Sequence, residues 1–168
     1  GQGISVANIN SGLLRYTPPV DANGAGYAGF TFQVQDNGGT ANGGVDLDQS
    51  PNTMTIDVVS VNDAPVGTDT TVTTLEDTQY TFTAANFGFT DPNDSPANSL
   101  LAVRITTLPA TGSLTLNGVA VTAGQNVSVA NINSGLLRFT PAANANGAAN
   151  ASFTFQVQDD GGTANGGI

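Results

Sequence analysis

Residues 153–162 read FTFQVQDDGG, and residues 30–39 read FTFQVQDNGG. In the first stretch Phe153, Phe155 and Val157 alternate with polar residues, which is typical of a β-strand with one buried face. The Asp-Asp-Gly-Gly that follows favours a turn, because Asp and Gly tolerate the backbone conformations that turns require. The stretch therefore predicts a strand that ends in an acidic loop.

The two stretches belong to a longer internal repeat. Residues 1–45 and 124–168 align at an offset of 123 residues, and 34 of the 45 aligned positions are identical. A period of this length indicates a tandem array. We interpret the 168 residues as a window on such an array, which covers a little more than one period.

The boundary between repeats is predicted near residue 63. The sequence VNDAP at 61–65 follows an alternating strand pattern at 54–61, and its proline cannot donate to a central sheet. Residues 1–63 are then the C-terminal part of one repeat, and residues 64–168 are the next repeat without its last strand. A sandwich that lacks its last strand leaves an open edge, so we expect residues 64–168 alone to be unstable or prone to aggregation.

The predicted fold class is all-β. Short runs rich in Val, Ile, Thr and Phe alternate with turn signals, and no segment keeps a helical period over 11 residues. Asn117-Gly118 between two apolar runs is typical of a type I′ hairpin turn. About eight strands in roughly 120 residues favour an antiparallel sandwich of immunoglobulin-like type. We expect strands near residues 68–75, 78–84, 100–108, 112–116, 119–122, 126–129, 136–140 and 151–158.

The composition excludes several function classes. The chain has twelve Asp, one Glu and three Arg, no Lys, His, Cys or Trp, and a formal net charge of −10. Catalysis by Ser/His, Cys/His or Schiff-base lysine is therefore excluded, and so are zinc sites built from Cys and His. The negative charge argues against nucleic-acid binding, and no apolar run reaches the ~20 residues of a membrane span. Oxygen-preferring cations such as Ca²⁺ are the expected partners.

Five motifs occur in a characteristic order, namely VNDAP at 61–65, LEDT at 75–78, FTDPND at 89–94, FTP at 139–141 and FTFQVQDDGG at 153–162. In this order the motifs resemble the cadherin-like tandem repeats, of VCBS or tandem-95 type, of giant bacterial surface adhesins. The resemblance implies an elongated tandem array of cadherin-like sandwiches in a secreted protein at the bacterial cell surface. It also implies a role in adhesion or biofilm formation, with calcium within or between the repeats.

The candidate calcium ligands lie in predicted loops at one pole of the sandwich, next to the incoming linker. Calcium takes six to eight oxygens from carboxylates, amides and backbone carbonyls. The expected ligands at this pole are Asn62, Asp63, Asp91, Asn93, Asp94, Asp159 and Asp160. By the parallel with cadherins, the preceding repeat would add Asp21 and Asn23 from its opposite pole.

A comparison of equivalent positions in the two copies of the repeat ranks these candidate calcium ligands. Asp21 is replaced by Asn144 in the second copy, so Asp21 is at most a secondary ligand, whereas Asp159 and its counterpart Asp36 are both Asp. The strongest candidates are Asp159, Asp91 and Asp63. Turn chemistry without any ion stays an alternative for each single Asp, because Asp, Asn and Gly favour turns on their own.

Three function classes follow from these observations. The first is a non-enzymatic spacer whose calcium-stiffened junctions, formed with neighbouring repeats of the same chain, extend an adhesin or an extracellular filament that self-associates. The second is a sandwich module that binds polysaccharide or a partner protein. The third, a two-carboxylate glycosidase, is disfavoured because no aromatic-lined cleft accompanies the acids.

Overall fold

The computed structural model describes residues 1–164. The chain divides into two compact units, Gly1–Ser60 and Val61–Ile168, which we call unit 1 and unit 2. The division lies next to the predicted linker at 61–65. No helix in the described part is long and apolar enough to cross a membrane.

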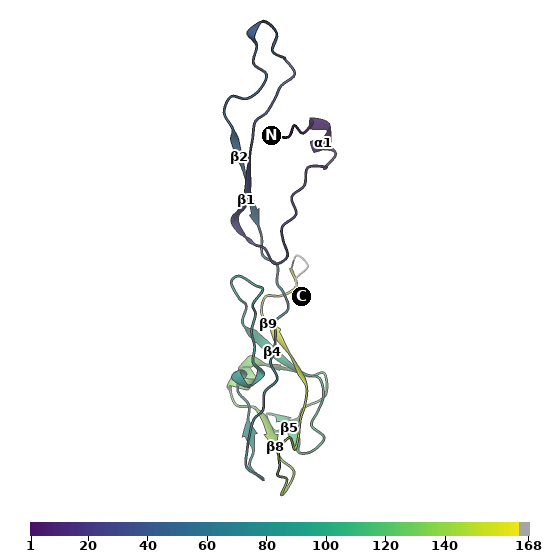
Figure 1. Cartoon of the computed structure of the whole chain (residues 1–168). Coiled ribbons are helices and arrows are strands. Elements are labelled where there is room, and N and C mark those ends of the chain that lie inside the picture. Colours follow the sequence, from purple (N-terminus) through teal and green to yellow (C-terminus); the bar gives the residue numbers. More distant parts are fainter. Residues whose placement is uncertain (165–168) are drawn as a thin grey trace. The chain divides into compact units, whose positions relative to one another are not determined.

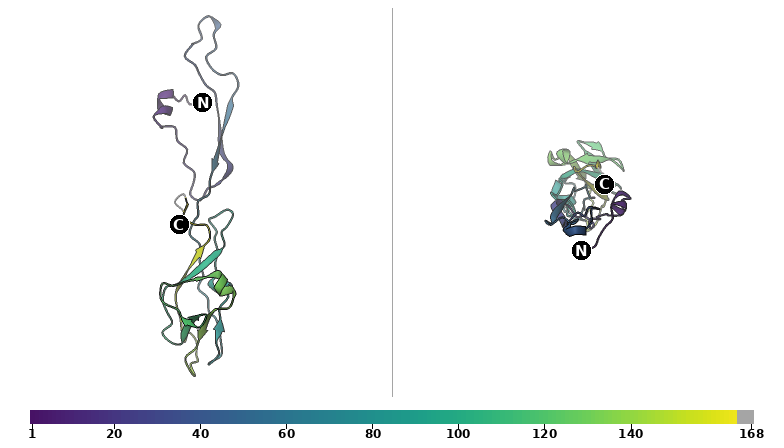
Figure 2. Two further views of the ribbon diagram at one scale, coloured as in Figure 1. Left: turned by 180° about the vertical axis from the view of Figure 1, so that it is seen from behind. Right: turned by 90° about the horizontal axis from the view of Figure 1, so that it is seen from above.

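Unit 1 consists of one antiparallel strand pair and two short helical turns. Its elements are α1 (Val6–Asn10), β1 (Gly24–Phe32), the 3-10 turn η1 (Ala41–Gly43) and β2 (Asn52–Val58). β1 and β2 pair with Phe30 opposite Met54 and Phe32 opposite Asn52, and they run side by side in Figures 1 and 2. None of the residues of unit 1 is buried, so unit 1 has no hydrophobic core.

Unit 2 contains two antiparallel sheets. One sheet has the strand order β3-β8-β5-β6 and the other the order β7-β4-β9, with the last two strands side by side in Figure 1. The strands are β3 (Tyr80–Thr81), β4 (Leu100–Ile105), β5 (Ser113–Leu116), β6 (Val119–Ala120), β7 (Asn126–Ser128), β8 (Leu137–Thr140) and β9 (Phe155–Asp159). The 3-10 turn η2 (Ala84–Phe87) and the helix α2 (Val129–Asn133) complete the unit.

The core of unit 2 is built from the inward faces of both sheets and from the two helical turns. Its buried residues are Phe82, Phe87, Val103, Ile105, Leu114, Val121, Val127, Ile132 and Leu137. From β9, Phe155 packs edge-to-face on Phe87 with ring centroids 5.0 Å apart. Each Phe ring removes a large apolar area from water, and edge-to-face pairs add to that gain. The predicted all-β sandwich is therefore confirmed.

The hairpin predicted at Asn117-Gly118 is present. Leu116 pairs with Val119 across the two-residue turn, and Asn117 and Gly118 have φ values of 50° and 78°. Two successive positive φ values are what a type I′ turn requires, and Asn and Gly tolerate them best.

Two features differ from the sequence prediction. The segment VANIN forms one helical turn in each copy, as α1 and α2, because Ser5 and Ser128 cap it by accepting from the N–H groups of Asn8 and Asn131. One turn is too short for a hydrophobic period to show.

The strand predicted at 68–75 does not form, and the strand predicted at 78–84 shrinks to β3. Near this part of the chain Val66 makes one isolated bridge with Thr90. A ladder needs a partner strand on its edge, and the pattern of one segment does not say whether a partner is present.

Candidate functional site

Seven polar residues of unit 2 gather where the linker meets the loops after Thr90 and after β9. We call this group the linker-end cluster. Its members are Asn62, Asp63, Asp91, Asp94, Asn98, Asp159 and Asp160. Six of them were predicted at this pole from the sequence, and the exception is Asn98.

Asn98 connects the linker to the acidic loop. Its side-chain Nδ2 donates to Asn62 Oδ1 at 2.5 Å and to Asp94 Oδ2 at 3.2 Å. Its backbone N–H donates to Asp91 Oδ2 at 2.5 Å. Asp94 Oδ2 also accepts from the backbone N–H of Asp63 at 2.9 Å. The loop at residues 91–98, with the sequence DPNDSPAN, therefore folds around Asn98. The linker is hydrogen-bonded to this loop.

The loop after β9 reaches the same place. Asp160 Oδ1 accepts from the backbone N–H of Ser99 at 2.7 Å, and the N–H of Asp160 donates to Ser99 O at 3.0 Å. Gly161 has no room for a side chain, because a Cβ there would overlap Asn62 Oδ1 and Asn98 Nδ2. This close approach explains the glycine after the two aspartates.

Two carboxylates of the cluster are buried and only half satisfied. Asp91 is 7% exposed and Asp159 is 6% exposed. Each uses one oxygen, with Asp91 Oδ2 accepting from Asn98 and Asp159 Oδ1 accepting from the N–H of Gly161 at 3.0 Å. Asp91 Oδ1 and Asp159 Oδ2 are buried without a hydrogen-bond partner. A buried carboxylate oxygen without a donor is costly, so these two atoms are the candidate ligands for a cation.

The arginines of unit 2 are placed elsewhere. Arg104 lies on β4 opposite Gln156 and Asn126, and Arg138 on β8 donates to Gly135 O and Gln79 Oε1. In the described part, no group of three or more Asp or Glu side chains is arranged to hold a metal ion. A cation at the cluster would therefore be held by fewer than three carboxylates and by neutral oxygens.

Three further residues, Asn93, Asp21 and Asn23, were also predicted as ligands. Asn93 is exposed on the loop. Asp21 and Asn23 belong to unit 1, where Asp21 has a φ of 59° and Asn23 Nδ2 donates to its carbonyl at 3.3 Å. That geometry is the turn chemistry that the sequence left open for this pair.

The counterpart of that turn in unit 2 is held by two acids of the LEDT motif. Asp77 Oδ1 accepts from the N–H of Asn144 at 3.0 Å, and Glu76 Oε2 accepts from Asn146 Nδ2 at 3.2 Å. Both carboxylates serve here as acceptors that fix a loop.

A family profile described as a bacterial Ig domain matches residues 62–168. The chain belongs to the bacterial Ig domain family. Domains of this family are commonly extracellular surface modules and typically non-enzymatic. No curated protein and no solved structure matches the chain. The match supports the Ig-like bacterial repeat, and the finer cadherin-like type stays a prediction.

Proposed function

We propose that this bacterial Ig domain is a spacer repeat of an extracellular adhesin or filament, and that its linker-end cluster binds Ca²⁺. The observation that carries the proposal is the pair of buried, unpartnered oxygens, Asp91 Oδ1 and Asp159 Oδ2. Both lie in loops that are hydrogen-bonded to the linker or to each other through Asn98 and Ser99.

The residues fit a hard cation. Calcium is bound by carboxylate, amide and backbone oxygens, and needs no more than a few charges among its six to eight ligands. Asp91 and Asp159 would hold the ion, with amide or carbonyl oxygens and water as the remaining ligands. The ion would supply the positive charge that two buried carboxylates lack, in a chain with a net charge of −10.

The mechanical consequence concerns the linker. Asn62 and Asp63 are bonded to the DPNDSPAN loop, so an ion that rigidifies this loop also restrains the chain that enters the domain. In an array of repeats, a restrained entry segment keeps successive domains from reorienting freely. A spacer that holds a distal region away from the cell requires such restrained reorientation of successive domains.

The test compares matched positions of the two copies. Asp159→Asn keeps the acceptor for Gly161 N–H but removes the charge, and Asp36→Asn makes the same change at the exposed counterpart, whose Oδ1 accepts from Gly38 N–H. We expect calcium to stabilise the 168-residue chain by about 2.7 kcal/mol at a hundredfold excess over Kd. Asp159→Asn should abolish this gain, and Asp36→Asn should retain it, in melts with calcium and with EDTA.

The alternative of turn chemistry predicts a different pattern. Without an ion site, Asp159→Asn still relieves the desolvation penalty of a buried unpaired charge, but its stability relative to the parent chain should be the same in calcium and in EDTA. If calcium leaves the melting temperature of the parent chain unchanged, the metal site does not exist and the loops are turns only. Magnesium is the control for non-specific screening of the negative charge.

A further inference from the structure

Asn98 contacts two parts of the linker-end cluster with two different groups. Its backbone N–H donates to Asp91 Oδ2, and its side-chain Nδ2 donates to Asn62 Oδ1 and to Asp94 Oδ2. Asn98 is half-buried, although the three residues before it on the loop are exposed. One residue therefore joins a carboxylate of the proposed calcium site to the linker.

The backbone contact determines which oxygen of Asp91 is left for an ion. Oδ2 accepts from the N–H of Asn98, and Oδ1 is buried without a hydrogen-bond partner. A ligand that is already held in its binding orientation loses less conformational freedom on binding, so preorganisation raises affinity. The position of Asn98 therefore sets the orientation of a proposed calcium ligand.

The side-chain contacts hold Asn98 itself in place. A Cβ on Gly161 would overlap the side-chain amides of Asn62 and Asn98, so the loop after β9 packs directly against their hydrogen bond. Asp94 Oδ2 accepts both from Asn98 Nδ2 at 3.2 Å and from the N–H of Asp63 at 2.9 Å. Two consecutive linker residues are thus held by groups that also fix Asn98.

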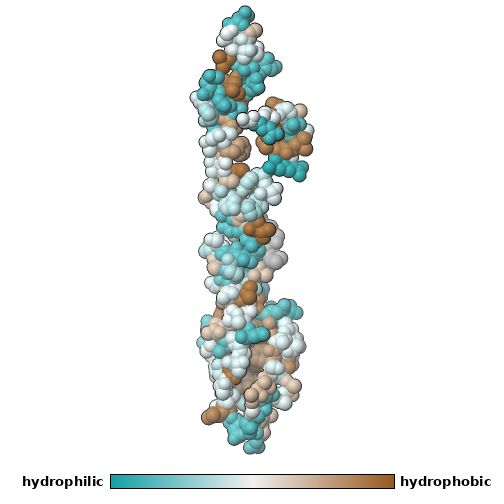
Figure 3. Space-filling view, in the orientation of Figure 1, coloured by the Kyte–Doolittle hydropathy of each residue, from teal (hydrophilic) through white to brown (hydrophobic). Residues whose placement is uncertain are grey.

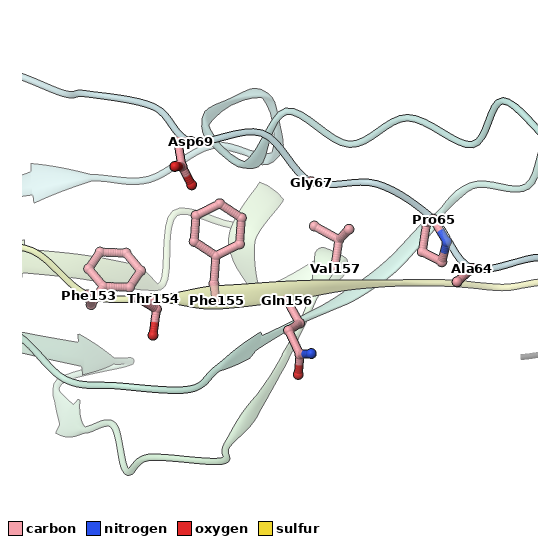
Figure 4. Close-up of a pocket in the computed structure, with 9 residues that line it drawn as sticks. All are labelled: Ala64, Pro65, Gly67, Asp69, Phe153, Thr154, Phe155, Gln156 and Val157. Carbon is pink, nitrogen blue, oxygen red and sulfur yellow. The ribbon is translucent and has the colours of Figure 1, made fainter.

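These contacts determine where the linker is anchored on unit 2. Farther along the chain, Val66 is fixed by two backbone hydrogen bonds to Thr90, both 2.8 Å long. Between the two anchors, Figure 4 shows Ala64 and Pro65 beside β9. Loss of the contacts at residues 62–63 would leave Val66 as the anchor, and the four residues before it can span up to ~14 Å. Docking of the linker therefore limits the reach of the segment that enters the domain.

We propose that Asn98 is the positioning residue that couples calcium binding to docking of the linker. The inference rests on the proposed calcium site and names the residue through which the linker regulates that site. The backbone of Asn98 orients Asp91 for the ion, and its side chain holds Asn62, so each event favours the other. Such coupling is reciprocal, because docking strengthens calcium binding by the same factor by which calcium strengthens docking. A force that pulls the linker off the loop lowers the affinity for calcium.

The first experiment measures the Kd for calcium by isothermal titration calorimetry of the 168-residue chain. The variants are Asn98→Ala, Asn62→Ala and the double variant, and none of them changes the net charge. Asn98→Ala should weaken binding by roughly fivefold or more, and the double variant should bind no more weakly than Asn98→Ala alone. Ser99→Ala is the control and should keep the parent Kd, because Ser99 contacts Asp160 only through backbone groups among the hydrogen bonds of the described residues.

The double variant separates coupling from direct ligation. If Asn62 Oδ1 bound the ion itself, Asn62→Ala would weaken binding in the Asn98→Ala chain as well, and the two losses would multiply. That result, or a parent Kd in Asn98→Ala, overturns the coupling while the calcium site stands. A parent chain that does not bind calcium overturns the site and the coupling together.

The second experiment follows docking of the linker by hydrogen exchange at the Asp63 amide, which donates to Asp94. In EDTA, Asn98→Ala should exchange roughly fivefold faster than the parent chain, because a neutral hydrogen bond that holds the linker is lost. Calcium should slow this exchange in the parent chain and in Ser99→Ala, and should slow it much less in Asn98→Ala. Equal slowing in all three chains overturns Asn98 as the coupling residue. Asn62→Ala breaks the same hydrogen bond from the linker side and provides the same test if Asn98→Ala does not fold.

Discussion

Units 1 and 2 place nearly the same 45-residue sequence in two environments. Locally the copies agree, because the VANIN turn, its serine cap and the bond from Arg Nε to a glycine carbonyl at 2.7 Å occur in both. The two copies differ in how deeply equivalent side chains are buried. Ile9 is 48% exposed and its counterpart Ile132 is 1% exposed, and Leu14 is 48% exposed while Leu137 is fully buried.

The difference shows that local structure and burial have separate causes. A capped turn needs only its own residues, so it forms wherever the sequence occurs. Burial needs partners, and in unit 2 these come from residues 64–123, which supply β4, Phe82 and Phe87. Figure 3 shows the consequence, with hydrophobic surface gathered over the α1 segment of unit 1. Half of a repeat can therefore fold locally without forming a core.

The largest expected difference in stability is between alanine variants of Leu137 and of its counterpart Leu14. Leu137→Ala removes a fully buried side chain and leaves a cavity, so unfolding of unit 2 should be easier by about 2–5 kcal/mol. Leu14→Ala removes the same atoms from an exposed site and should change stability by less than about 0.5 kcal/mol. Urea denaturation followed by circular dichroism measures both variants. Equal losses would mean that unit 1 has a core in solution.

The second largest difference in stability is expected between alanine variants of Gly161 and of its counterpart Gly38. Gly161→Ala forces a Cβ against Asn62 and Asn98, which breaks their hydrogen bond and should cost about 1–3 kcal/mol. At the counterpart Gly38, a Cβ would meet only the side chain of Asp36, at 3.1 Å, so Gly38→Ala should cost much less. The same denaturation experiment compares them, and a milder effect at Gly161 would argue against the linker-end cluster as a packed unit.

The smallest expected effect concerns the two serine caps. Ser128→Ala leaves the N–H of Asn131 without its acceptor in a turn that packs on the core, and should cost about 0.5–2 kcal/mol. Ser5→Ala removes the equivalent bond to Asn8 in an exposed turn, where water can replace it. Its effect on global unfolding should be close to zero. Amide hydrogen exchange at Asn8 and Asn131 reads out both turns separately, and faster exchange at Asn8 in the parent chain is the expected result.

Much of the site could be predicted because turn residues and strand ends are local signals. Alternation in FTFQVQ placed the aspartates at the end of β9, and the sandwich topology brought that end to the linker. Asn98 could not be predicted in the same way. It is one polar residue among several in a loop, and its importance comes from three hydrogen bonds to Asn62, Asp91 and Asp94. The only signal was its place just before β4.

The sequence by itself determined the period of 123 residues, the all-β class, the Asn-Gly hairpin and the acidic pole, because each rests on local patterns or on self-similarity. Tertiary structure alone decided which copy of each apolar residue is buried and which carboxylate oxygens lack a partner. The reason is that burial, satisfaction of polar atoms and strand pairing depend on segments distant in the chain. Identical residues such as Leu14 and Leu137 therefore have different environments.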